Sequence, residues 1–166
     1  LSLHDALPIC DVIPVTVGGK PIFLIRNSLD EIGCYHNVCR HRCLKIIDKT
    51  ANVGPRIRCP YHSWVYNLDG SLRRARRSEL IENFCESDIH LASIQVETFC
   101  HLIFVNLDAD AASLAEQSGD LGKEVLSSAP DLGNLTFAHR LTYRLKANWK
   151  AVVDNFLECY HCPVAH

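Results

Sequence analysis

The sequence predicts a small all-β domain over residues 10–108, followed by a segment of different composition that ends in a helix. Two observations favour the β domain: short runs rich in β-branched residues recur between turn motifs, and no helical period is found there. A third observation is the change after residue 108, where the chain becomes rich in Ala, Ser and Gly. A length of 166 residues fits one ordinary domain, or one small domain and part of another.

The first expected element is a β-hairpin. The strand-like runs VIPVTV (12–17) and PIFLIRN (21–27) flank Gly18 and Gly19, and a Gly-Gly pair permits the tight turn of a hairpin. Further short strands are expected at 44–47, 56–58, 64–67, 93–98 and 101–107, beside the turn motifs NVGP, LDGS and LDAD.

The region after residue 108 contains three kinds of segment. Residues 109–134 have weak helical periodicity and are expected to form a connector or a short helix. Residues 135–148 (LTFAHRLTYRLKAN) alternate apolar and polar side chains, as an exposed strand does. Residues 148–162 contain no helix breaker before Pro163, which predicts a helix.

Charge and hydropathy limit the partners. The formal net charge is −2, so no overall field favours nucleic acid or anionic lipid. No apolar run approaches the ~20 residues of a membrane span, and the start has no basic-then-apolar signal segment. We therefore expect a cytoplasmic protein that binds neither nucleic acid nor membrane.

The first nine residues are treated separately. LSLHDALPI matches one translated frame of a widely used sequencing adapter, so we expect residues 1–9 to be an artefact of library construction. His4 and Asp5 are therefore left out of any site. On this interpretation the chain derives from a sequencing read, and both of its ends are set by that read.

Cysteine is abundant, with nine residues, and several of them lie within four residues of a histidine. Without a secretion signal, this pattern indicates metal ligation in a reducing compartment rather than disulfides. The clearest constellation is Cys39-x-His41, then 17 residues, then Cys59-x-x-His62. Each of the two loops would offer one thiolate and one imidazole to a shared metal centre.

Two metal centres fit these four ligands. Zinc accepts two Cys and two His in tetrahedral geometry. A Rieske [2Fe–2S] cluster divides them, with two Cys on one iron and two His on the other. The Cys-x-His order is unusual for a zinc finger, and the context CPYHSW favours the cluster. Surface Cys and His without any metal are the third interpretation.

A second constellation lies at the end of the chain, in ECYHCPVAH. Glu158 and His161 are three residues apart and share a helix face, with Asp154 one turn earlier. Pro163 would end the helix near Cys162 and allow His166 to turn back. Two His and a carboxylate form the facial triad of non-haem iron(II) oxygenases. Alone, however, such a His pair is more often incidental.

The motifs together resemble a known family. NVCRHR, CPYHSWVYNLDGSLRRA, VETFCHLIFVNLD and NWKAVVDNFLECYHCPVAH follow one another in the order found in the large (α) subunit of Rieske non-haem iron oxygenases, also called ring-hydroxylating oxygenases. The resemblance covers residues 10–166 and the N-terminal part of that subunit. It implies a mainly β Rieske domain of two small antiparallel sheets with cluster-binding loops over 10–108. Residues 109–166 would be a connector and the truncated start of an α+β catalytic domain.

The resemblance also implies site residues. The [2Fe–2S] cluster would be bound by Cys39, His41, Cys59 and His62. The mononuclear iron(II) would be bound by His161 and His166, with a third, carboxylate ligand that lies beyond this chain. Glu158 would be the carboxylate that bridges His62 of one subunit and His161 of the next, and Asn155 would lie near the iron without binding it.

The implied function is that of a terminal oxygenase. The cluster would pass electrons to the mononuclear iron for O₂-dependent hydroxylation or demethylation of a small organic substrate. Electrons would come from NAD(P)H through a ferredoxin or flavin reductase, and the intact protein would be a homotrimer or an α3β3 assembly. This fragment is expected to be inactive alone. The alternative is a stand-alone Rieske ferredoxin, an electron carrier, against which residues 148–166 argue.

Three further features bear on the site. Cys43 stands where the family usually has Gly, and Tyr61 leaves the second loop without the cysteine that forms a disulfide in high-potential Rieske proteins. Glu158 in place of Asp is similar to the branch that acts on quaternary amines, but the substrate stays open. The basic run Arg73, Arg74, Arg76 and Arg77 is either a solvated edge or a docking patch for an acidic ferredoxin.

Overall fold

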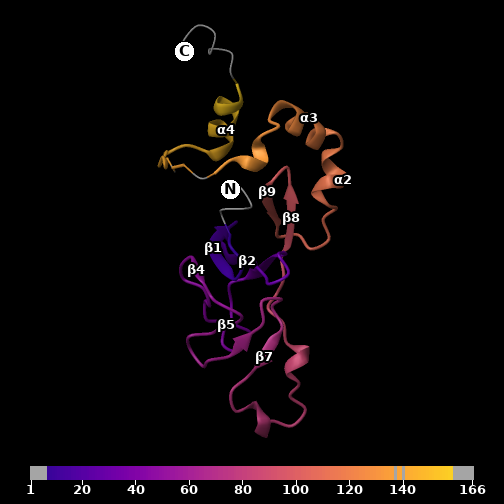
Figure 1. The fold of residues 1–166 in the computed structure, drawn as a ribbon. Helices are drawn as coiled ribbons and strands as arrows, with labels where there is room; N and C mark the ends of the chain where they lie inside the picture. Colours follow the sequence, from indigo (N-terminus) through magenta and orange to yellow (C-terminus); the bar gives the residue numbers. More distant parts are fainter. Residues whose placement is uncertain (1–6, 137, 140, 159–166) are drawn as a thin grey trace.

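The computed structural model describes residues 7–136, 138–139 and 141–158, and its strands form three antiparallel sheets (Figure 1). The four-stranded sheet has the order β3-β2-β1-β4. Its strands are β1 (Asp11–Val17), β2 (Lys20–Arg26), β3 (Ile32–His36) and β4 (Ala51–Asn52). The three-stranded sheet consists of β5 (Ile57–Arg58), β6 (Val65–Tyr66) and β7 (Leu72–Arg74), in that order. The third sheet pairs β8 (Gln95–Phe99) with β9 (Leu102–Asn106).

The predicted hairpin is confirmed as β1 and β2. Val17 pairs with Lys20 across the turn, and Gly18 and Gly19 have φ of 55° and 77°. Both glycines adopt the left-handed conformation that a two-residue hairpin turn requires. The mainly β fold of small antiparallel sheets is likewise confirmed, with one sheet more than the two expected.

One hydrophobic core joins the first two sheets. Val12, Phe23 and Ile25 come from the four-stranded sheet, and Ile57 and Tyr66 come from the three-stranded sheet. The same cluster of buried side chains contains both Cys39 and Cys59. The two thiols are therefore held by packing that involves most of the β region.

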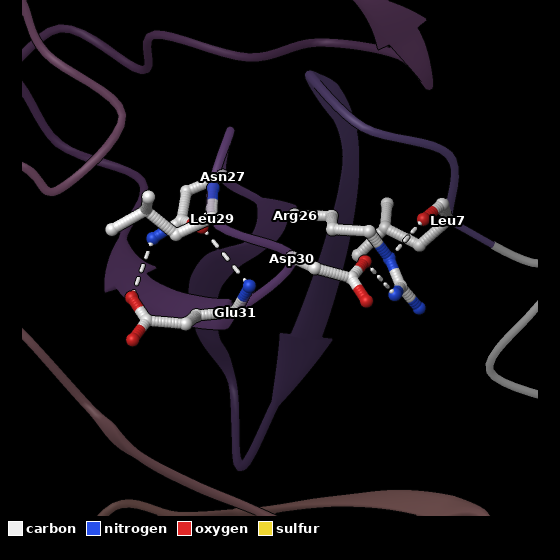
Figure 2. Close-up of polar contacts among 6 residues, drawn as sticks. All are labelled: Leu7, Arg26, Asn27, Leu29, Asp30 and Glu31. Carbon is white, nitrogen blue, oxygen red and sulfur yellow. Dashed lines mark hydrogen bonds and ion pairs between the residues drawn. The ribbon is translucent and has the colours of Figure 1, made fainter.

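The start of the described chain is fixed by Arg26, which is 7% exposed (Figure 2). Its Nε donates to the carbonyl oxygen of Leu7 at 2.6 Å, and its Nη1 contacts Oδ1 of Asp30 at 2.5 Å. Leu7 is itself fully buried. The foreign origin of residues 1–9 stays a prediction, but Leu7 contributes to the packing.

The described α-helices follow the sheets in the chain, and in Figure 1 they lie at the end opposite β5 and β7. They are α2 (Leu114–Ser118), α3 (Leu121–Ser128) and α4 (Trp149–Leu157). Ser113 and Glu116 form a capping box at the start of α2, which satisfies two backbone N–H groups that a helix leaves unpaired. Short 3₁₀ turns lie at Ser78–Leu80, Glu86–Asp88 and Leu132–Asn134. None of the described helices is long and apolar enough to cross a membrane.

Two predicted strands are wrong, and one predicted helix is confirmed but ends earlier than expected. Residues 44–47 form no strand, because the amide groups of Ile46 and Ile47 donate to the side chain of Asn37 instead. The described part of 135–148 forms no strand, since none of the three sheets offers it a neighbour. The helix predicted at 148–162 ends at Leu157, and Glu158 is already extended. A short helix without a covered apolar face gains little from continuing.

Candidate metal centre

Two loops carry the predicted cluster ligands, and their backbones close in the same way. In the first cluster loop, residues 39–44, the N–H of Cys43 donates to the carbonyl of Cys39 at 3.0 Å. In the second cluster loop, residues 59–64, the N–H of Ser63 donates to the carbonyl of Cys59 at 3.1 Å. Cys43 and Ser63 have φ of 54° and 57°. The Gly usual at position 43 is thus explained by a left-handed backbone, which Cys43 adopts at some cost.

The two thiols form a buried pair at the inner side of the loops. Cys39 and Cys59 are 1% and 2% exposed, and their side chains lie within hydrogen-bonding reach of each other. Burial raises the pKa of the Cys59 thiol and the Cys39 thiol adds to the rise, whereas the backbone N–H groups of Tyr61 and His62 lower it. Such N–H groups stabilise a negative sulfur.

Tyr66 contacts the first thiol from β6. Its hydroxyl lies 3.2 Å from Sγ of Cys39 and accepts from the backbone N–H of Arg40 at 3.1 Å. Burial and the bond to Cys39 raise the pKa of the Tyr66 hydroxyl. It therefore stays protonated and can donate to a Cys39 thiolate.

The two imidazoles form an exposed pair on the outer side. The rings of His41 and His62 are 4.7 Å apart between centroids, and both residues are exposed. The indole of Trp64 stacks on His41 at 4.7 Å with an interplanar angle of 6°. Desolvation, followed by the charges of His62 and Arg42, lowers the pKa of His41. That shift favours the neutral imidazole that binds metal.

The separation into two pairs fits a [2Fe–2S] cluster. One pair of sulfurs points inward and one pair of ring nitrogens lies at the surface, as two irons with different ligands require. A tetrahedral zinc site would instead gather all four donors around one ion. Among the described residues, no three or more His, Cys, Asp or Glu side chains are grouped to hold one metal ion. The chemistry of the four residues therefore fits the cluster better than zinc.

Sequence reasoning missed Asn37, which supports the first loop. Asn37 is fully buried; its amide donates to the carbonyl of Ile47 at 2.7 Å and accepts from Ile46 and Ile47 at 3.0 and 2.8 Å. The only signal in the sequence is that a polar residue, Asn37, stands two positions before the first cluster loop, next to the apolar Val38. Trp64 belongs to the main cluster of buried side chains, and its stacking on His41 was likewise not predicted.

Two cavities lie beside the second cluster loop, and Ser63 and Arg76 line both of them. The first, of about 400 Å³, is lined by His41, His62, Trp64, Arg76 and Arg77, among others. The second, of about 480 Å³, is lined by Arg56, Arg58, Ser63, Val65, Arg73, Arg74 and Arg76. The predicted basic run is therefore divided between them, and Arg56 and Arg58 join it from another part of the chain.

The second predicted constellation is described only in part. Asn155 lies within α4, and the N–H of Glu158 caps that helix by donating to the carbonyl of Asp154 at 3.0 Å. His161 and His166 lie outside the described residues. The expectation that Glu158 and His161 share a helix face assumed a helix reaching Cys162, and the extended backbone of Glu158 removes that argument.

Two family models match the chain. Residues 4–85 match the Rieske [2Fe-2S] domain, and residues 132–166 match the catalytic domain of ring hydroxylating alpha subunits. The carnitine monooxygenase oxygenase subunit of Escherichia coli (strain K12) is 37% identical over 94% of this chain and 42% of its own length. The glycine betaine monooxygenase oxygenase subunit of Pseudomonas aeruginosa (strain UCBPP-PA14) is 33% identical over 93% of this chain and 35% of its own length. The chain thus spans less than half the length of these relatives.

A solved structure supports the same relationship. A quaternary ammonium Rieske monooxygenase in complex with L-carnitine superposes with a TM-score of 0.88 at 32% sequence identity. The match covers 98% of this chain and 46% of the solved chain. The likeness therefore extends over both the sheets and the helical segment.

Proposed function

Because the chain belongs to the family of Rieske non-haem iron oxygenase α subunits, we propose that it carries the electron-receiving part of an O₂-dependent oxygenase. The observation that carries this proposal is the arrangement of two buried thiols and two exposed imidazoles on matched loops. Residues 10–108 would form the cluster domain, and residues 109–166 the connector and the start of the catalytic domain.

The residues around the cluster have distinct tasks. Cys39 and Cys59 would hold one iron inside the core, and His41 and His62 the other at the surface. When bound, the cluster would supply one-electron transfer and the mononuclear iron(II) would supply O₂ activation. Trp64 fixes the plane of the His41 ring and limits the access of water to one of its faces.

The cluster is tested by spectroscopy. The chain reconstituted with iron and sulfide should be red-brown, and after reduction its EPR signal should average below the free-electron g value. Binding of one equivalent of zinc, with no iron or sulfide, would show that the site is a zinc centre instead.

The mononuclear iron site is proposed from the match of residues 132–166 to the catalytic domain. His161 and His166 would bind this iron, and the third carboxylate would come from the part of family members that this chain does not span. Glu158 would link His62 of one subunit to His161 of the next within a homotrimer or an α3β3 assembly. Asn155 would lie near the iron.

Glu158 can be tested in the protein produced from its full reading frame. Glu158→Gln keeps the shape but removes the charge, so cluster and iron should load while product formation collapses. Glu124→Gln, at an exposed carboxylate of α3, is the control. If Glu158→Gln oxidises its reduced cluster at the parent rate in stopped-flow experiments and couples this to product, Glu158 is not the bridge.

For the substrate we propose a small quaternary amine, hydroxylated or demethylated with electrons from NAD(P)H through a ferredoxin or flavin reductase. Both relatives described above are named for such substrates, carnitine and glycine betaine. The full-length protein with a reductase should consume O₂ in the presence of carnitine, glycine betaine or choline. Uptake of O₂ coupled to product with naphthalene, and with none of the three amines, would assign an aromatic substrate instead.

The second candidate function is a stand-alone Rieske electron carrier. The match of residues 132–166 to an oxygenase catalytic domain argues against it. The 166-residue chain should show no turnover alone, because His161 and His166 would lack their carboxylate partner. Turnover by this chain with a competent reductase would contradict our assignment of the iron ligands.

A further inference from the structure

Five arginines line one cavity beside the second cluster loop, and we call this group the arginine cup: Arg56, Arg58, Arg73, Arg74 and Arg76. The cup forms because β6 lies between β5 and β7. Arg58 pairs with Val65, and Val65 pairs with Arg74. Residues directly opposite each other in a sheet point to the same face, so Arg58 and Arg74 flank Val65 there. The cavity measures about 480 Å³.

The positive charge of the cup is not neutralised within the described chain. None of its five guanidinium groups forms an ion pair or hydrogen bond with a described residue, and all five side chains are exposed. The chain has 17 Lys and Arg against 19 Asp and Glu, so the cup is a local concentration on a slightly acidic molecule. Like charges in one concavity repel each other, and an anionic partner would relieve that repulsion.

The cup adjoins the exposed edge of the cluster site. Ser63, which follows the ligand His62, and Arg76 line both the cup and the cavity that contains His41 and His62. A protein bound in the cup would therefore lie beside the second cluster loop and close to the two imidazoles.

We propose that the arginine cup is the docking site for a carboxylate-rich surface of the protein that donates electrons to the cluster. This inference rests on the proposed function, and it identifies the surface to which the electron-donating protein would bind. Guanidinium groups match carboxylates in bidentate geometry. Exposed charge pairs mainly raise the association rate and bind weakly at physiological salt, which suits a donor that must leave after each electron.

A small phosphate ligand fits the cup less well. Beyond the arginines its lining consists of Ser63 and Val65, so it offers no aromatic ring to stack on a base and no acidic group to bind a ribose. A specific small-molecule site usually combines apolar walls with a few polar groups, whereas this one is nearly all cationic.

The test uses the cluster-loaded chain and a reduced plant-type [2Fe–2S] ferredoxin, an acidic donor, as the probe in stopped-flow experiments. Replacing Arg56, Arg73 and Arg74 together by Gln should lower the second-order rate of cluster reduction at least about tenfold at low ionic strength. The salt dependence of that rate should flatten. The control removes the same charge elsewhere, with Lys20, Lys49 and Arg144 changed to Gln, and should keep the parent rate.

Photochemical reduction by uncharged deazariboflavin should be equal in all three proteins, and equal EPR signals would show that the cluster itself is intact. A missing cluster signal in the parent would defeat the proposed function rather than the docking site. The docking site is overturned if the cup variant keeps the parent rate and salt dependence, or if the ferredoxin fails to reduce the parent. It is also overturned if pyrophosphate binding depends on the cup while ferredoxin reduction does not.

Discussion

In the first cluster loop the N–H of Cys39 donates to the carbonyl of Leu44 at 2.8 Å, and in the second the N–H of Cys59 donates to the carbonyl of Trp64 at the same distance. The histidine follows its cysteine by two residues in the first loop and by three in the second. A shared backbone closure thus tolerates different ligand spacings, because its hydrogen bonds join the residues at the ends of each loop and not the histidine between them.

The loops differ in what supports them. The first loop depends on residues outside it. The side chain of Asn37 accepts hydrogen bonds from the segment directly after the loop. Tyr66 contacts Cys39, and Trp64 stacks on His41. The second loop supplies its own N–H groups to the sulfur of Cys59. Loss of a distant side chain should therefore damage the first loop more than the second.

The largest effect should come from the ligands themselves, where the two loops should not differ. Cys39→Ala and Cys59→Ala each remove one thiolate from a buried pair, so both variants should fail to retain iron and sulfide. Iron analysis and the visible spectrum measure this. Cys85→Ala, at an exposed free cysteine, is the control and should load fully. A cluster retained at parent occupancy in either ligand variant would mean that the ligand set is wrong.

Asn37→Ala should separate the two loops most strongly. It leaves the buried amides of Ile46 and Ile47 without an acceptor, at a cost of about 3 kcal/mol in the free energy of unfolding. Urea unfolding of the apo-chain measures the loss. Asn52→Ala is the control, because Asn52 also makes three hydrogen bonds but is exposed. Equal losses in the two variants would show that Asn37 does not support the first loop specifically.

Tyr66→Phe should change the cluster more than the fold. The variant removes the hydrogen bond to Cys39, which stabilises negative charge on the sulfur, so the reduction potential should fall by a few tens of mV, or about 1 kcal/mol. Redox titration followed by EPR measures the shift. Tyr61→Phe, at an exposed ring beside His62, should leave the potential within error. No shift in Tyr66→Phe would remove Tyr66 from the support of the first loop.

The difference between the loops also explains what the sequence could predict. The first hairpin has its turn in Gly18 and Gly19 and was predictable, and the four proposed ligands were identified because they lie within short local motifs. Asn37 was not, because its partners Ile46 and Ile47 are nine and ten residues away and no periodic pattern connects them.

The arginine cup was predictable only in part for a related reason. The run from Arg73 to Arg77 is visible in the sequence, but Arg56 and Arg58 reach it only through the pairing of β5 with β6 and of β6 with β7. The strands expected at 56–58 and 64–67 are confirmed as β5 and β6, but their pairing was not predicted, and β7, with three residues, shows too little alternation to be detected. The strand β3 was missed because Gly33 and His36 interrupt its β-branched pattern.

The smallest predicted effect tests whether the two closures are equivalent. Cys43 and Ser63 have left-handed backbones, which cost a residue with Cβ about 1–2 kcal/mol relative to Gly. Glycine also loses about 0.5–1 kcal/mol more conformational entropy on folding. Cys43→Gly and Ser63→Gly should therefore each raise the free energy of unfolding by no more than about 1 kcal/mol.

Urea unfolding of the apo-chain measures both variants, with Ser28→Gly as the control. Ser28 is exposed and is not among the residues of positive φ, so glycine there should only destabilise. The gain at Ser63 should be the smaller of the two, because Ser63 is half-buried and Cys43 is exposed. A gain at Cys43 combined with a clear loss at Ser63 would mean that the second loop depends on its side chain. The similar hydrogen bonds made by the N–H groups of Cys43 and Ser63 would then not mean that the two loops close in equivalent ways.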